Sequence, residues 1–216
     1  MINIKSYILS AFGTNCYLVW KDGSPDAFIV DPGAPSAALQ ADVEKNGLDP
    51  KYIVLTHGHG DHTGGLAFCK ECWPEIKVVA SKKEEKLLYS RRDSYGKGGI
   101  TADVWTHDGD VLKVGDMELK FISTPGHTPG GQCVLVDRTL FSGDTLFHAS
   151  VGRTDLWGGS FEDLMDSITK KLFLLPEDSS MRQSRKRLTI SVPLCQSLSP
   201  TALTSARFIM NLTSRR

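Results

Sequence analysis

The chain has 216 residues, and its 25 Lys or Arg balance 25 Asp or Glu, so the formal net charge at pH 7 is zero. This length allows one well-packed core, and 40% hydrophobic with 23% charged residues is typical of a soluble globular protein. No apolar run approaches a membrane span, the N-terminus lacks signal-peptide organisation, and five cysteines without a framework spacing favour a reducing compartment. We therefore expect a cytoplasmic protein with no membrane partner.

The zero net charge hides a division of the chain. Residues 179–216 hold six Arg, one Lys and no acid, so residues 1–178 carry 18 basic and 25 acidic side chains. Because residues 1–178 carry more acidic than basic side chains, they offer no excess positive charge that would attract nucleic acid. The composition therefore argues against nucleic-acid partners and against nucleases.

In the first part of the chain, apolar residues recur at spacings typical of strands in some segments and of helices in others. One of these helices is predicted to end at Gly47, a helix stop signal. The expected strands are residues 3–9, 15–21, 27–31, 52–55 and 77–80, and the expected helices are residues 36–46, 65–72 and 82–89.

The segment after the expected strand at residues 52–55 concentrates metal-binding side chains. It reads Thr56-His57-Gly58-His59-Gly60-Asp61-His62 and holds three of the six histidines of the chain. Imidazole and carboxylate are usual ligands of zinc and similar divalent metals. On extended backbone His57, His59 and Asp61 project to one side, whereas His62 falls on the other side of the turn. Because one metal does not need four donors from one segment, the pattern predicts half of a two-metal site rather than a polar loop with chance histidines.

Strand patterns dominate the next part of the chain and enclose two further candidate ligands. His127 lies in a turn rich in Pro and Gly, which fixes the backbone so that the imidazole can point inward. Asp144 ends a buried strand, where a carboxylate would be costly unless it met a cation. The expected strands are residues 111–114, 118–123, 133–136 and 139–142.

A capping pattern, Ser160-Phe161-Glu162-Asp163, opens the last clear helix, whose buried stripe is Leu164, Ile168 and Leu172. Apolar strands flanked by helices on both outer faces predict an α/β protein with a four-layer αββα sandwich.

Up to about residue 175 the chain resembles the metallo-β-lactamase fold hydrolases, and in particular their small glyoxalase II-like members. The resemblance implies the αββα sandwich and a small-molecule substrate. The segments that carry it, besides the histidine motif at residues 57–62, are Ile29-Val30-Asp31-Pro32-Gly33, Thr124-Pro125-Gly126-His127-Thr128-Pro129-Gly130, Phe141-Ser142-Gly143-Asp144-Thr145-Leu146-Phe147 and Val151-Gly152-Arg153-Thr154-Asp155.

The resemblance also implies which residues would bind metal. According to this resemblance, a first metal is held by His57, His59 and His127. A second metal is held in part by Asp61 and His62, and Asp144 bridges the two metals. The candidate catalytic residues are Asp61 and Asp144. The expected cofactor is Zn²⁺, as one or two ions, with iron or manganese as alternatives. A bound metal lowers the pKa of water towards about 7, and two metals roughly 3.5–4 Å apart can share a hydroxide. The implied activity is hydrolysis of a thioester or similar small acyl substrate, as in hydroxyacylglutathione hydrolases.

Two alternatives stay open. An iron-dependent oxygenase of the same fold, similar to persulfide dioxygenases, would use two histidines and an aspartate at a single-metal site, and iron accepts these ligands. The other alternative is a metal-binding remnant with impaired activity. The oligomeric state stays unknown.

The C-terminal part departs from the family pattern. A segment resembling Pro-Gly-His-Gly should follow residue 178 and give one more histidine ligand, but the last histidine of the chain is His148. His148 could substitute, although a solvated side chain is the simpler interpretation. We therefore expect a hydrolase domain at residues 1–178 that lacks its last segment, and an atypical basic Ser/Arg-rich tail at residues 179–216. A shifted reading frame or recombined end explains this tail, and a genuine extension is the competing explanation.

Overall fold

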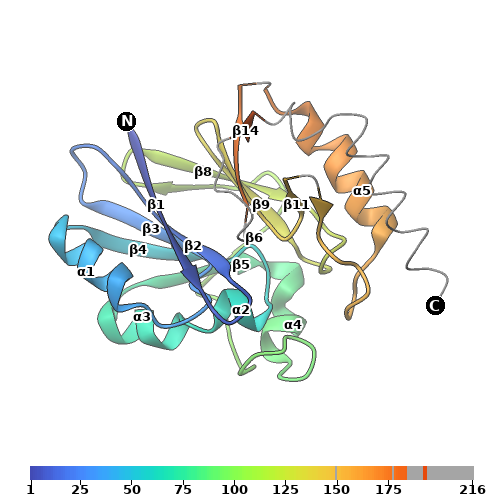
Figure 1. The fold of residues 1–216 in the computed structure, drawn as a ribbon, viewed down its shortest axis with the longest axis horizontal. Coiled ribbons are helices and arrows are strands. Elements are labelled where there is room, and N and C mark those ends of the chain that lie inside the picture. The colour runs from blue at the N-terminus through green and yellow to red at the C-terminus, as the bar shows by residue number, and fades with distance from the viewer. Residues whose placement is uncertain (149, 177, 184–191, 194–216) are drawn as a thin grey trace.

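The computed structural model describes residues 1–148, 150–176, 178–183 and 192–193. Two six-stranded sheets pack face to face, and helices cover both outer faces (Figure 1). The expected four-layer αββα sandwich is confirmed. No helix in the described part of the chain is long and apolar enough to cross a membrane.

The first sheet has the strand order β1-β2-β3-β4-β5-β6. Strands β1 to β3 pair antiparallel, and β3 to β6 pair parallel. The expected elements of this part are present with ends shifted by a few residues, whereas β6 was not predicted because its three residues are too few to show a period. The strands are β1 Ile2–Leu9, β2 Thr14–Lys21, β3 Asp26–Val30, β4 Asp49–Val54, β5 Lys77–Ser81 and β6 Val104–Thr106, and the helices are α1 Ala37–Lys45, α2 Gly60–Thr63, α3 Leu66–Cys72, the 3₁₀ helix η1 Lys82–Glu84 and α4 Glu85–Tyr89.

The second sheet has the order β14-β13-β10-β9-β8-β7, and a small sheet pairs β11 with β12. Helix α5 (Phe161–Lys170) and the 3₁₀ helix η2 (Leu172–Leu174) cover the outer face of the second sheet. The expected stripe of Leu164, Ile168 and Leu172 is buried, with its last residue in η2 rather than in α5. The side chain of Ser160 caps α5 by accepting a hydrogen bond from Asp163 N, as the capping pattern predicted. The elements are β7 Val111–Val114, β8 Met117–Ser123, β9 Gln132–Val136, β10 Thr139–Gly143, β11 Leu146–Phe147, β12 Ser150–Val151, α5 Phe161–Lys170, η2 Leu172–Leu174, β13 Ser180–Gln183 and β14 Val192–Pro193.

The core between the two sheets is built from inward-facing strand residues. Along β8 buried and exposed positions alternate, as the strand period of two requires. Phe141 of β10 meets Tyr17 of β2 edge to face, with ring centroids 5.3 Å apart, and also meets Phe28 of β3. These contacts hold the sheets together beside the edge at which the candidate ligands lie.

The described fold continues past residue 178, which corrects the expected boundary. Strand β13 pairs in parallel with β10, and Met181 is buried against α5. The side chains of Asn15 and Tyr17 donate hydrogen bonds to the carbonyl oxygen of Gln183, at 2.9 and 2.6 Å. Strand β13 was not recognised in sequence because Met181 is the one apolar residue among its four. Residues 184–191 and 194–216 lie outside the described residues, so their separation from the hydrolase domain stays a prediction.

Candidate metal centre

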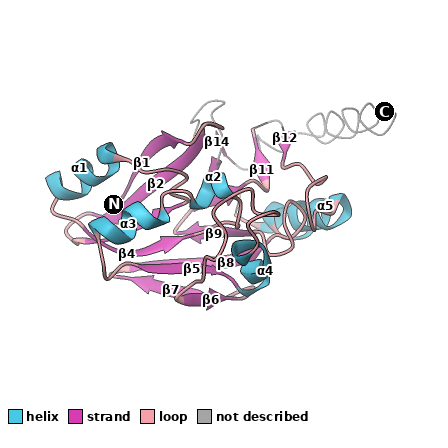
Figure 2. Ribbon diagram, turned by 90° about the horizontal axis from the view of Figure 1, so that it is seen from below, coloured by secondary structure: helices cyan, strands magenta, loops and turns pink. Residues whose placement is uncertain are grey.

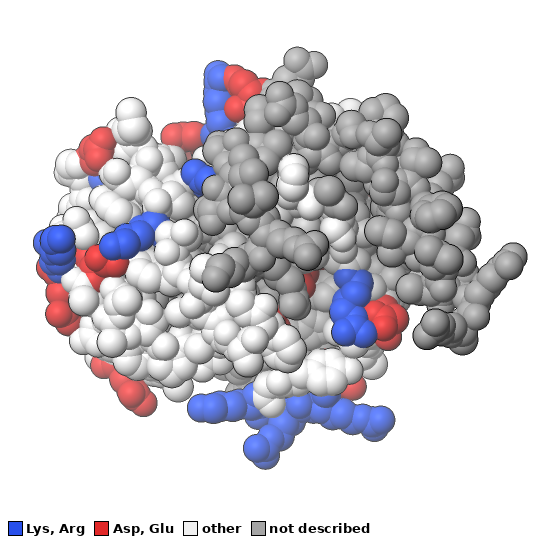
Figure 3. All heavy atoms as spheres, viewed as in Figure 1, with Lys and Arg blue, Asp and Glu red and all other residues white. Residues whose placement is uncertain are grey.

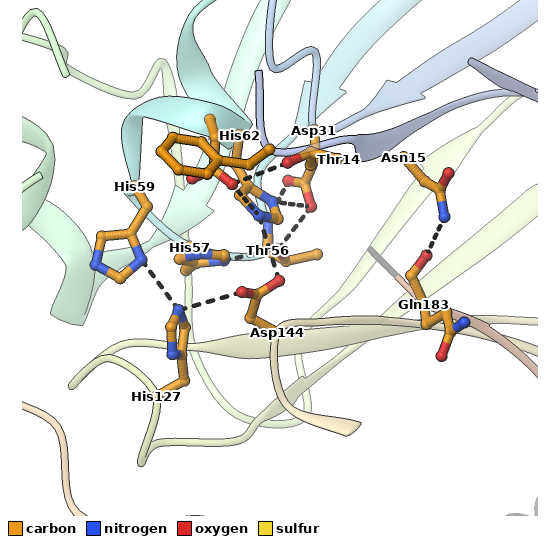
Figure 4. A network of polar contacts seen from close by, with 12 residues as sticks. Thr14, Asn15, Asp31, Thr56, His57, His59, His62, His127, Asp144 and Gln183 are labelled. Atoms are coloured by element: carbon orange, nitrogen blue, oxygen red, sulfur yellow. Dashed lines mark hydrogen bonds and ion pairs between the residues drawn. The ribbon is translucent and has the colours of Figure 1, made fainter. Parts of the chain in front are cut away.

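Four segments that follow strand ends supply the polar side chains of the site. Asp31 follows β3, and the histidine motif follows β4 and continues into α2. The turn with His127 follows β8 of the second sheet, and Asp144 follows β10. Because these strand ends meet at one edge of the sandwich, residues far apart in sequence converge there (Figure 4).

Two groups of buried side chains at this edge could each hold a metal ion. One is His57, His59 and His127, and the other is His57, His62 and Asp144; within each group the potential ligand atoms lie within 4.8 Å of one another. In the first group His59 Nδ1 is 3.0 Å from His127 Nε2. The remaining expected ligand, Asp61, lies beside the second group, with Oδ2 3.7 Å from His62 Nε2. The structure thus brings together all six residues named as ligands from the sequence.

Asp144 stands between the two groups, with one carboxylate oxygen towards each. Its Oδ1 is 3.4 Å from His62 Nε2, and its Oδ2 is 3.6 Å from His127 Nε2 (Figure 4). A carboxylate in this position can contribute one oxygen to each of two neighbouring cations. The geometry is therefore compatible with the bridging role that the sequence suggested.

Several nitrogen atoms of the site fit a bound cation. His57 Nε2, His59 Nε2 and His62 Nε2 are buried and have no hydrogen-bond partner among the described residues. A buried polar atom left unsatisfied costs about 1–3 kcal/mol, so such atoms call for a partner. Histidine nitrogens beside carboxylates are a donor set that zinc and iron both accept. The residues present therefore fit a divalent metal.

The protonation states of three of these groups agree with this use, whereas His62 must release a proton to bind metal, because its burial is outweighed by Asp31 and Asp144, which raise its pKa well above the ordinary value. Burial and the neighbouring histidines lower the pKa of His57 well below its ordinary value and the pKa of His59 to about 4. Burial alone would raise the pKa of Asp144, but His62 outweighs it and holds that pKa well below the usual range. His57 and His59 are thus neutral and Asp144 is ionised at neutral pH, which are the forms that bind metal.

Asp31 orients His62, a role that the sequence did not reveal. Its Oδ2 lies 2.8 Å from His62 Nδ1, so the imidazole presents Nε2 towards Asp61 and Asp144. Thr56 donates its backbone N–H to Asp31 Oδ1 at 2.8 Å and its hydroxyl to Oδ2 at 2.7 Å. Carboxylate partners of this kind fix the ring orientation of metal-binding histidines. The feature of the sequence that could have indicated this role is the position of Asp31, a carboxylate at the end of an apolar strand and directly before Pro32.

The ring of His127 is fixed in a similar way by the loop after β12. His127 Nδ1 lies 2.7 Å from the carbonyl oxygen of Arg153, which can only accept, so Nδ1 carries the proton and Nε2 faces Asp144. The Arg153 side chain makes two 2.7 Å hydrogen bonds to Asp155. His148 is exposed and belongs to neither group, which agrees with a solvated side chain.

Glu84 ties the two histidine-bearing loops together. Its Oε2 accepts the N–H of Gly58, between His57 and His59, and its Oε1 accepts the N–H of Gly130 in the turn after His127, both at 2.7 Å. The side chain is 1% exposed. The sequence placed this residue in the expected helix at residues 82–89 but indicated no role for it, because a glutamate in the charged run Lys82-Lys83-Glu84-Glu85-Lys86 carries no sign of burial.

We expect the Glu84→Gln variant to bind its tighter metal about 10–100-fold more weakly, the range measured for residues that support metal ligands. Glutamine keeps the shape, but its amide NH₂ would face one of the two backbone N–H groups instead of accepting from it. Chelator competition measures the dissociation constant. Glu85→Gln, which changes the exposed neighbour of Glu84, is the control. An unchanged dissociation constant in Glu84→Gln would contradict the role given to this carboxylate.

A cavity of about 300 Å³ opens over the metal centre. His59, Asp61 and His127 form its floor, and the ring of Tyr95 lies 6.2 Å from the ring of His59. Phe12, Arg153 and Leu156 complete the lining. Arg153 is thus salt-bridged to Asp155 and also borders the cavity.

Comparisons with known proteins agree with this architecture. The family model for the Metallo-beta-lactamase superfamily matches residues 9–178. The hydroxyacylglutathione hydrolase GloC of Haemophilus influenzae is 34% identical over 187 residues, covering 82% of this chain and 87% of that protein. The crystal structure of the B3 metallo-beta-lactamase BLEG-1 has a TM-score of 0.83 at 30% identity and covers 94% of this chain and 99% of its own. The structure of TTHA1623 in a di-iron-bound form has a TM-score of 0.75 at 27% identity and covers 89% and 96%.

Proposed function

Since the chain belongs to the metallo-beta-lactamase superfamily and is a hydrolase of that superfamily, we propose that its substrate is a small thioester, as the name of its relative GloC indicates for that protein. The observation that carries the proposal is the pair of buried ligand groups that share His57, with Asp144 of the second group also facing His127 of the first. Zinc as the metal and the cytoplasm as the location are part of the same proposal. The four described cysteines are free thiols, which is consistent with a reducing compartment.

The reaction adds water to the acyl carbon and breaks the C–S bond, so that a carboxylic acid and a thiol are released. A divalent metal held by these residues would supply an activated water and polarise the carbonyl. Asp61 borders the cavity and is the carboxylate best situated to take the proton of the attacking water. Its Oδ2 accepts a hydrogen bond from Thr14 Oγ1 at 2.8 Å, which keeps the carboxylate in one orientation. A thiol, with a pKa near 8.5, leaves without a dedicated acid.

The cavity supports a small acyl substrate. Its volume of about 300 Å³ is at the lower end of the usual range for small-molecule sites. Phe12, Tyr95 and Leu156 give its walls an apolar and aromatic character, whereas the polar groups gather at the metal centre. An acyl group can therefore pack on the walls while its carbonyl points towards the histidines.

We expect the protein to hydrolyse a 2-hydroxyacyl thioester with a kcat/KM well above its values for a phosphodiester and for a β-lactam. All three classes are assayed with the same metal-loaded preparation. Release of the thiol is followed with a thiol reagent, and the Asp144→Asn variant serves as the inactive control. A clear preference for the phosphodiester or the β-lactam would contradict the thioester proposal.

An iron-dependent oxygenation, similar to that of persulfide dioxygenases, is the second candidate. It is supported by the composition of one ligand group, two histidines and one aspartate, and by a di-iron-bound relative among the solved structures. Oxygen consumption with a persulfide substrate by the iron-loaded protein would favour this candidate. Thiol release from a thioester without oxygen uptake would favour the first.

A further inference from the structure

A segment rich in lysine and arginine lies beside the cavity. Residues 82–97 hold six basic and three acidic residues, although residues 1–178 as a whole carry more acid than base. Figure 3 shows basic side chains gathered at the lower edge of the face, where Figure 1 draws α4 and the loop after it. The six basic residues, all exposed, are called the basic rim: Lys82, Lys83, Lys86, Arg91, Arg92 and Lys97.

Three hydrogen bonds anchor this segment to the metal-binding loops. At its start, Glu84 accepts the backbone N–H groups of Gly58 and Gly130. Further along, the carbonyl oxygen of Ser94 accepts the N–H of Gly60 at 2.7 Å. The approach at Gly60 is so close that a Cβ atom there would lie 2.6 Å from the carbonyl oxygen of Tyr95. The segment therefore lies directly against the loop that carries His59 and Asp61, and Figure 2 draws α4 beside α2 from a second direction.

Tyr95 connects the basic rim to the cavity. It adopts a positive φ of 53° and contributes its side chain to the lining beside His59. A chain spans at most about 3.6 Å per residue, so the Cα atoms of Arg92 and Lys97 lie within roughly 11 and 7 Å of that of Tyr95. The backbone of both basic residues thus lies close to that of a residue that lines the cavity. At physiological salt the Debye length is about 8 Å, which sets how near to the basic rim an anionic group must come.

Few acidic groups pair with the basic rim. Among the described residues, one salt bridge involves a residue of the basic rim, and it joins Lys82 to Glu85 at 2.7 Å. Asp93 accepts a hydrogen bond from the Ser90 hydroxyl, and Glu84 is buried away from the surface. Arg153, which also lines the cavity, is paired with Asp155. The excess of basic over acidic residues beside the cavity therefore lies mainly in this segment.

We propose that the basic rim binds the anionic thiol half of the substrate while the acyl half occupies the cavity over the metal centre. This inference rests on the proposed thioester hydrolysis and adds that the leaving thiol is negatively charged. Carboxylates of a thiol peptide such as glutathione and phosphates of coenzyme A share this chemistry. A local field of this kind raises the concentration of anionic ligands at a site even on an acidic protein.

The test removes three charges that flank Tyr95, in the variant Arg91→Gln/Arg92→Gln/Lys97→Gln. A matched control, Lys45→Gln/Lys77→Gln/Lys113→Gln, removes three exposed lysines elsewhere on the sandwich. Both variants and the unchanged protein receive the same acyl group as a glutathione thioester, a coenzyme A thioester and the uncharged N-acetylcysteamine thioester. The first two arms distinguish carboxylate from phosphate recognition.

We expect the rim variant to lose about tenfold in kcat/KM on at least one anionic thioester, through KM rather than kcat. Its kcat/KM on the uncharged thioester, and all values of the control variant, should stay within twofold of the unchanged protein. Added salt should reduce the preference of the unchanged protein for anionic thioesters. Equal losses on charged and uncharged thioesters, or no loss on any, would overturn the proposal.

Binding without turnover separates this proposal from the proposed function. Calorimetry with S-methylglutathione and S-methyl-coenzyme A requires no hydrolysis. Weaker binding of one of them to the rim variant, with salt-sensitive binding to the unchanged protein, supports the basic rim even if no thioester is hydrolysed. Binding that is indifferent to the three charges refutes the basic rim, even if thioester hydrolysis is found.

Discussion

The His59→Ala variant is expected to lose at least one equivalent of bound metal and nearly all hydrolysis, a fall in kcat/KM of at least about 1,000-fold. His59 Nδ1 lies 3.0 Å from His127 Nε2, and His59 also lines the cavity. A metal supplies several kcal/mol of transition-state stabilisation, and a factor of ten in rate corresponds to about 1.4 kcal/mol. Loss of the metal therefore removes the greater part of catalysis.

Metal content is measured by elemental analysis, and activity is measured on the same preparation. His148→Ala is the matched control, because it removes an exposed histidine that belongs to neither ligand group. It should keep its metal and its activity. Full metal content in His59→Ala would show that the ligand assignment is wrong.

The Asp144→Asn variant should bind the second metal too weakly to detect at micromolar concentration, and its kcat should fall at least about 100-fold. Each carboxylate oxygen faces one of the two ligand groups. Asparagine keeps a single acceptor oxygen and removes the negative charge, so it cannot serve both cations. His62 would also lose the carboxylate that, together with Asp31, raises its pKa well above the usual value.

Titration with zinc and with cobalt measures the second equivalent. Asp110→Asn, in an exposed turn, controls for the loss of one carboxylate. Two metals bound with unchanged affinity in Asp144→Asn would mean that this residue does not bridge them.

Sequence patterns predicted most of the strands because these strands are short apolar runs that are buried almost continuously, as in β3 and β5, or alternate in burial, as in the first five residues of β8. They failed for β6 and β13, which have three and four residues. The sequence of β13 does not show that Met181 is buried, because the residues that surround Met181 are distant along the chain.

The candidate ligands could be named from sequence because His57, His59, Asp61 and His62 form one local motif. The supporting residues could not, since their partners are distant along the chain. Asp31 meets Thr56 and His62, and Glu84 meets Gly58 and Gly130. Net charge was equally uninformative about the basic rim, because an average over residues 1–178 does not describe the field beside one cavity.

Metal titration of the purified, metal-free chain tests the central claim most directly. His57, His59 and His127 are all present for the first site, whereas Asp61, His62 and Asp144 leave the second without a further histidine, because none follows His148. The account predicts one tight and one loose equivalent, with activity rising as the second is filled. Absence of any tight metal, or two equally tight ones, would contradict it.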